Sequence, residues 1–317
     1  MKIGIIKNSG EPLMVAVYGK DGVSIPEALE MLGERRVNEL SEFITCWQAD
    51  IVSLNEKIRG LYQSGKAKDF IFPLQNAEFL PPFPKNPKIL TGRGNSTLFT
   101  QAVEVPLCRQ PIIEQRYNFN YAGHNSTLTF GPDTLKGGWN YEIAAVMGKT
   151  AKDVKKENAY EYIFGYTSMI DMSVGHTDYP FNEGNKWEFP ENEKVFLDYA
   201  FQGCFNSNIS GPIPLGPVIV TKDEAGDPHA QVLTERESGR LISRGLTDGV
   251  IFTFPEEVEY LTSFMTLDPG DMINSASISY DGYPFGKKYK EGSYIQGETT
   301  NIDAVRIYIN DEREEKA

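Results

Sequence analysis

The alternation of apolar and polar residues in the first part of the chain is typical of β-strands. It covers residues 2–7 and 13–18, which a turn sequence at residues 8–12 separates. Two helical patterns follow, one beginning at Pro26 and one ending at residues 64–66. Their apolar positions are Leu29, Leu32, Leu40 and Phe43, and then Leu54, Ile58, Leu61 and Tyr62. We therefore expect a small α+β unit at the N-terminus.

A proline-rich segment at residues 79–88 favours extended backbone and marks the expected domain boundary. We predict a small N-terminal α+β domain over residues 1–85 and a second domain over residues 86–317. The second part is rich in β-favouring runs, at residues 122–130, 141–147, 162–172, 215–221, 271–279 and 304–310. One helix interrupts them, with Pro255 in its first turn and Val258, Leu261, Thr262 and Met265 along one side. The fold class predicted is α+β, mostly β, rather than a doubly wound parallel sheet.

Charge and composition limit the partners. The chain of 317 residues has 31 basic and 44 acidic residues, a net charge of -13. This balance disfavours nucleic acid and anionic membrane surfaces. No apolar run approaches the roughly 20 residues that cross a bilayer, and no signal peptide is apparent, so we expect a cytoplasmic protein with a small-molecule substrate. The cysteines, Cys46, Cys108 and Cys204, are too far apart for a zinc ribbon and indicate no disulfide framework.

Two carboxylates lie inside apolar strands, where an isolated charge is costly. These are Glu142 and Asp171, and Asn140 shares a strand face with Glu142 because it precedes it by two residues. Two carboxylates and an amide oxygen form a hard donor set that suits Mg2+, Mn2+ or Ca2+. The alternative is that both acids bind backbone amides or an arginine.

Several motifs in the second part resemble the fumarylacetoacetate hydrolase superfamily from about residue 87 to residue 310. They lie at residues 87–94, 140–149, 165–173, 214–221, 247–252 and 266–271. The resemblance implies a mixed β-sheet roll or barrel domain, a homodimer, and divalent-metal chemistry on diketo or 2-oxo acids. The family's metal ligands are Glu-x-Glu and a later Asp. Here Asn140 replaces the first Glu, so we expect a weakly held cation.

The resemblance also points to site residues, and it shows departures. The family's catalytic His and Glu correspond to Leu98 and Gln101, neither of which activates water by proton transfer. Candidate acid–base residues are instead His176, His124 and Lys194, and candidate substrate-binding residues are Arg93, Arg116, Tyr121 and Thr247. The alternatives are a loop histidine bound to Asp178 for His176, a turn histidine for His124 and a surface lysine for Lys194.

Three functional hypotheses follow. The first is an enzyme that enolises or cleaves a small oxo or diketo substrate at a divalent cation held by Glu142, Asp171 and Asn140. The second is a metal-independent isomerase, cyclase or lyase, since the hydrolytic pair and one metal ligand are replaced. The third is a non-catalytic relative that binds a ligand or a partner.

Overall fold

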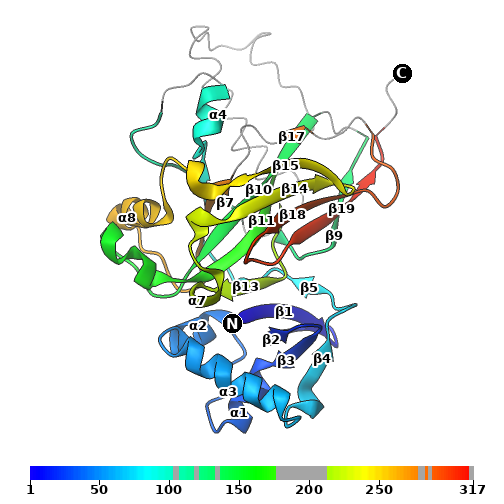
Figure 1. The fold of residues 1–317 in the computed structure, drawn as a ribbon, viewed down its shortest axis with the longest axis vertical. Coiled ribbons are helices and arrows are strands. Elements are labelled where there is room, and N and C mark those ends of the chain that lie inside the picture. The colour runs from blue at the N-terminus through cyan, green and yellow to red at the C-terminus, as the bar shows by residue number, and fades with distance from the viewer. Residues whose placement is uncertain are drawn as a thin grey trace.

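The computed structural model describes residues 1–102, 107–117, 121–132, 136–175, 213–277, 283–284 and 288–313. Its N-terminal part, blue in Figure 1, combines four strands with three helices. The strands are β1 (Lys2–Asn8), β2 (Glu11–Tyr18), β3 (Asp21–Ser24) and β4 (Ile71–Pro73), and the helices are α1 (Ile25–Met31), α2 (Leu40–Trp47) and α3 (Ile51–Gln63). The helical pattern that begins at Pro26 is two helices rather than one, because Gly33 has a φ of +78° just after α1.

One large sheet runs through the molecule in the order β4-β3-β2-β1-β13-β11-β10-β16-β6-β7. Its further strands are β13 (Val218–Thr221), β11 (Ile163–Gly175), β10 (Lys136–Met147), β16 (Met272–Ser277), β6 (Ile89–Arg93) and β7 (Ile112–Arg116), with β5 (Phe79–Leu80) beside β1 and β17 (Tyr283–Pro284) beside β10. The pairing of β1 with β13 carries this sheet across the expected boundary at residue 85. The division into two domains stays a prediction.

A second sheet has the order β15-β14-β18-β19-β9. Its strands are β15 (Arg240–Leu246), β14 (Val232–Glu237), β18 (Tyr294–Thr299), β19 (Val305–Asp311) and β9 (Ser126–Phe130). The two sheets meet at Tyr141 of β10, which is fully buried and packs against Gly297 of β18 so closely that a Cβ there would clash with the ring. A parallel pair, β8 (Tyr121–Ala122) with β12 (Ile213–Pro214), completes the strands. The mostly-β α+β fold predicted from the sequence is confirmed.

The remaining elements are short except for one helix. The helix α8 (Phe254–Phe264) begins with a capping box in which Thr253 and Glu256 bind each other's backbone, as expected for the pattern at Pro255. The others are α4 (Thr97–Ala102), α7 (Lys222–Ala225), and the 3-10 turns η1 (Lys68–Phe70), η3 (Lys156–Tyr162), η5 (Pro228–Ala230) and η6 (Thr247–Gly249). Within the described part of the chain, no helix is both long and apolar enough to cross a membrane.

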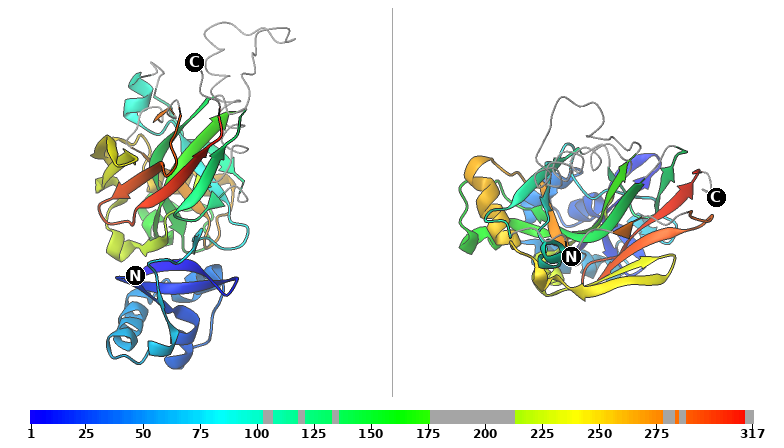
Figure 2. Two further views of the ribbon diagram at one scale, coloured as in Figure 1. Left: turned by 90° about the vertical axis from the view of Figure 1, so that its right-hand side faces the viewer. Right: turned by 90° about the horizontal axis from the view of Figure 1, so that it is seen from above.

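The end of the large sheet is strongly curved. Three strands, β10, β16 and β6, separate β11 from β7, so a flat sheet would hold β11 and β7 about 19 Å apart. Nevertheless Arg116 of β7 hydrogen-bonds to Asp171 of β11. The sheet therefore curves here, as the bent strands in the view from above in Figure 2 do. Side chains of β7 and β11 meet across this curve. This curvature creates the candidate site.

Candidate functional site

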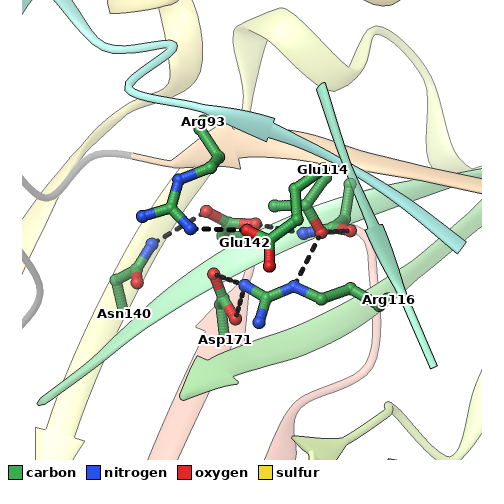
Figure 3. A network of polar contacts seen from close by, with 8 residues as sticks. Arg93, Glu114, Arg116, Asn140, Glu142 and Asp171 are labelled. Carbon is green, nitrogen blue, oxygen red and sulfur yellow. Dashed lines mark hydrogen bonds and ion pairs between the residues drawn. The ribbon is translucent and has the colours of Figure 1, made fainter. Parts of the chain in front are cut away.

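The polar side chains of five neighbouring strands meet inside the curved part of the sheet (Figure 3). In strand order the contributors are Asp171 from β11, Asn140 and Glu142 from β10, Asn274 from β16, Thr91 and Arg93 from β6, and Glu114 and Arg116 from β7. We call this set the polar cluster. Side chains two residues apart on a strand share a face, which explains the pairs that β10, β6 and β7 contribute. Asn140 pairs with Asp171 across β10 and β11, so the expected ligands of the two strands lie side by side.

Arg116 and Asp171 form a buried ion pair at the centre of the polar cluster. Nη2 of Arg116 donates to Oδ1 of Asp171 at 2.6 Å and to Oδ2 at 2.8 Å. The Arg116 side chain is only 2% exposed and that of Asp171 15%. Burial opposes the charge on Arg116, yet Asp171 and Glu114 outweigh it and raise the guanidinium pKa above its usual value. Arg116 is therefore a permanent positive charge within the cluster.

Glu142 has amide partners instead of a cation. Nδ2 of Asn140 donates to Oε1 of Glu142 at 2.8 Å, and Nδ2 of Asn274 donates to Oε2 at 2.5 Å. Burial, followed by the nearby charge of Asp171, raises the pKa of Glu142 to about 8. The Glu142 carboxyl group therefore holds a proton near neutral pH.

A second ion pair and a hydroxyl bridge complete the polar cluster. Nη1 of Arg93 donates to Oε2 of Glu114 at 2.5 Å, and both side chains are nearly buried. Thr91 accepts from Nε of Arg116 at 3.2 Å and donates to Oδ1 of Asn274 at 2.7 Å. The bridge connects Arg116 to the amide that binds Glu142, so a change at either end alters the position of the other.

Two of the buried donors that have no acceptor in the part of the chain that the structure describes belong to the polar cluster or feel its charges. They are Nη1 of Arg116 and Oη of Tyr121. Burial raises the pKa of the Tyr121 hydroxyl above its usual value, and the charges of Arg116, Asp171 and Glu142 all act on it. The hydroxyl therefore stays protonated beside the ion pair, where it can donate to a ligand oxygen.

As it lies, the polar cluster does not fit a divalent cation. Both oxygens of Asp171 bind Arg116, and both oxygens of Glu142 bind amide N–H groups. Among the described residues no group of three His, Cys, Asp or Glu side chains is arranged to hold a metal ion. Asp171 thus has the arginine partner that the sequence left open, whereas Glu142 binds side-chain amides rather than the backbone amides considered there.

Two of the candidate residues lie elsewhere. His124, in the turn between β8 and β9, accepts from the Arg306 backbone N–H at 3.2 Å through Nδ1 and packs edge-on against Phe79. Burial lowers its pKa to about 4, so it is a neutral turn histidine, the alternative expected from the sequence. Oγ1 of Thr247 donates to the Pro228 carbonyl at 2.7 Å and accepts from the Gln231 N–H at 3.0 Å, which commits it to the backbone. His176 and Lys194 lie outside the described residues.

Besides Glu114, a neighbouring carboxyl group on α8 was not expected from the sequence. Glu257 of α8 is fully buried and accepts from Oγ of Ser275 at 2.7 Å and from Nδ2 of Asn95 at 3.4 Å. Burial raises its pKa well above the usual range, and Glu142 adds to this effect. The only available signal was an acid on the apolar side of a helix, one residue before Val258.

Comparison with known proteins places the chain in a family. Residues 91–307 match the family described as fumarylacetoacetate (FAA) hydrolase C-terminal, and the chain belongs to this family. Oxaloacetate tautomerase FAHD2B, a mitochondrial protein of Bos taurus, is 27% identical over 243 residues, which are 76% of this chain and 71% of that one. The human mitochondrial oxaloacetate tautomerase FAHD2A is 26% identical over the same shares of the two chains. The resemblance inferred from the motifs is confirmed.

Solved structures agree in fold. Maleylpyruvate hydrolase from Sphingobium sp. SYK-6, solved in complex with manganese(II) and pyruvate, has a TM-score of 0.69 and 17% identity and covers 99% of this chain and 100% of that one. The 5-carboxymethyl-2-hydroxymuconate delta-isomerase from Mycobacterium smegmatis has a TM-score of 0.67 and 19% identity with the same coverage. The relatives therefore include a hydrolase, an isomerase and tautomerases.

Proposed function

We propose that this chain is an isomerase that interconverts the keto and enol forms of a small 2-oxo acid. The observation that carries the proposal is the pair of buried donors, Arg116 Nη1 and Tyr121 Oη, that have no acceptor among the described residues. Leaving a buried donor unsatisfied costs about 1–3 kcal/mol, so a substrate oxygen that accepts from either donor is favoured there. An enolate oxygen fits best, because its charge develops opposite a permanent cation.

The substrate class follows from the same donors. A guanidinium binds carboxylate and enolate oxygens, and the tyrosine hydroxyl adds a directional hydrogen bond. Oxaloacetate, on which the tautomerase relatives act, and pyruvate, bound in the maleylpyruvate hydrolase structure, are both small 2-oxo acids. These two compounds support small 2-oxo acids as the substrate class of the present site.

Glu142 is the group that we assign to proton transfer. Asp171 and Glu114 are each paired with an arginine, whereas the described partners of Glu142 are amides. In the proposed reaction the ionised form of Glu142, which predominates above about pH 8, takes a proton from C3. The C2–C3 double bond forms, and the carbonyl electron pair moves onto oxygen beside Arg116 and Tyr121. The same proton then passes to that oxygen and completes the enol, so no co-reactant is consumed.

Isomerisation is favoured over hydrolysis by the residues of α4. Leu98 and Gln101 correspond to the family's catalytic His and Glu, and both side chains are exposed, Leu98 by 55%. Neither accepts a proton from water at neutral pH. A divalent cation, Mg2+ or Mn2+, remains the alternative for polarising the substrate, supported by the manganese in the maleylpyruvate hydrolase structure. The arginine bound to Asp171, one of the expected ligands, favours the metal-independent form here.

We also propose a homodimer in the cytoplasm. Strand β15 lies at an edge of the second sheet and carries two exposed apolar side chains, Leu241 and Leu246, at 52% and 53% exposure. Such side chains on an edge strand are candidates for contact with a second copy. Light scattering gives twice the chain mass if the proposal is correct, and Leu241→Lys is expected to weaken the dimer.

The function is tested by following the keto–enol interconversion of oxaloacetate through the absorbance of the enol. We expect the wild-type chain to accelerate it and Tyr121→Phe to be slower, while Gln101→Ala is unchanged as the control. The absence of acceleration with any small 2-oxo acid would contradict the proposal. So would release of carbon–carbon cleavage products from a diketo acid at a comparable rate.

A further inference from the structure

We infer that Arg116 occupies the position of a divalent cation, and that a latent metal site lies beneath it, which the loss of its guanidinium opens. This inference concerns binding alone and does not depend on the reaction proposed above. It starts from the expected ligands Asn140, Glu142 and Asp171, which the structure does bring together (Figure 3).

The guanidinium lies where a cation would serve Asp171. A single nitrogen, Nη2, is 2.6 and 2.8 Å from the two carboxylate oxygens, so it faces the chelating side of the carboxylate. Both carboxylate oxygens that a bidentate cation would bind are therefore already bound to Arg116. The Arg116 side chain is only 2% exposed, so it is surrounded by protein on nearly all sides.

The other expected ligands have adapted to the arginine. Asn140 directs Nδ2, a donor, toward Glu142, whereas a metal ligand would direct its oxygen. Asn274 donates to the second oxygen of Glu142, and Thr91 links Asn274 back to Nε of Arg116. Removing Arg116 frees one carboxylate and the bridge that fixes Asn274, so an oxygen donor set with two carboxylates becomes available.

Two variants of Arg116 distinguish exclusion of the metal by charge from exclusion by volume alone. Arg116→Lys keeps a positive charge beside Asp171, whereas Arg116→Met keeps most of the volume without the charge. If charge and position exclude the metal, the lysine variant stays closed to Mn2+ and the methionine variant opens. If only volume matters, both variants behave alike.

The test is a titration of chelator-treated protein with Mn2+, in which electron paramagnetic resonance reports the free ion. We expect Arg116→Met to bind one Mn2+ per chain at least about tenfold more tightly than the wild type and Arg116→Lys, since ligand charge sets affinity. Arg116→Met/Asp171→Asn is expected to lose this gain. Arg116→Gln replaces the methionine variant if circular dichroism shows that the latter does not fold.

The inference is overturned if the wild-type chain itself binds one Mn2+ as tightly as Arg116→Met. It is also overturned if a folded Arg116→Met or Arg116→Gln variant shows no gain. None of these results depends on catalysis, so failure of the tautomerase assay leaves this test unaffected.

Discussion

One guanidinium nitrogen of Arg116 binds both carboxylate oxygens of Asp171, although their strands are separated by three others in the sheet. Breaking a buried pair by removing one partner costs about 3–5 kcal/mol, because the other charge is left without compensation. Arg116→Met should therefore lower the free energy of unfolding by about 3 kcal/mol, as measured by urea denaturation. In Arg116→Met/Asp171→Asn, where neither charge remains, a large part of this loss should be recovered.

The exposed pair of Lys7 and Glu78 is the matched control. Their side chains are 46% and 61% exposed, and a surface ion pair contributes about 0–1 kcal/mol. Lys7→Met should change the free energy of unfolding by less than about 1 kcal/mol. If Lys7→Met and Arg116→Met were equally destabilising, the buried pair would not contribute more to the free energy of unfolding than a surface pair, and the prediction would be wrong.

Tyr121→Phe should change activity and stability in opposite directions. The hydroxyl is buried without an acceptor among the described residues, so its removal is expected to leave stability unchanged or raise it by about 1 kcal/mol. The loss of one oxyanion donor should slow enolisation by about 100-fold. Thermal denaturation and the enolisation rate check the two halves. A slower but also less stable variant would indicate a structural role instead.

His124 should be dispensable for catalysis. It accepts from the Arg306 N–H, and its pKa is lowered to about 4 by burial and by the charge of Arg306. Because the unfolded chain binds a proton near pH 6.5 and the folded chain does not, stability falls as the pH decreases from about 6.5 to 4. His124→Gln should keep the wild-type rate and show a weaker decline over this range. A large loss of activity would restore His124 as a catalytic candidate.

Gly92 of β6 should not tolerate a side chain. A Cβ there would lie within 3.0 Å of Glu257 Oε1 and Ser275 Oγ, both of which are buried. Gly92→Ala should therefore destabilise the protein by about 1–3 kcal/mol through overpacking. Gly60, inside α3, has nothing within 4 Å of the same position, and Gly60→Ala should stabilise by about 0.5–1 kcal/mol. Equal effects of the two substitutions in denaturation would refute this packing.

Local patterns predicted the parts of the site that depend on one strand. The two-residue period placed Asn140 and Glu142 on one face, and they do contact each other. The partnership of Arg116 with Asp171 depends on the curvature of five strands, which no local pattern encodes. For the same reason Glu114 and Asn274 were not recognised as site residues. Their strands, β7 and β16, lie on either side of β6, and no local pattern shows this.

The fold was predictable where apolar runs are long. Strands β10, β11 and β16 follow the expected runs, but the expected strand over residues 122–130 is two strands, because Asn125 has a φ of +66° and makes a turn. The hairpin of β14 and β15 was missed, since charged residues dilute its alternation. The available signal was the Ser238-Gly239 dipeptide, which is typical of a two-residue hairpin turn. In the structure these residues have φ of +47° and +84°.

The most direct test of the account is the exchange of C3 protons of pyruvate or oxaloacetate for deuterium, followed by NMR in D2O with chelator-treated protein. The account predicts that the metal-free wild-type chain catalyses this exchange and that Arg116→Met reduces the rate by at least about 100-fold. Gln101→Ala, on α4, should exchange as fast as the wild type. If the metal-free wild-type chain were inactive and Mn2+ restored exchange, a metal rather than Arg116 would stabilise the enolate, and the central claim would be contradicted.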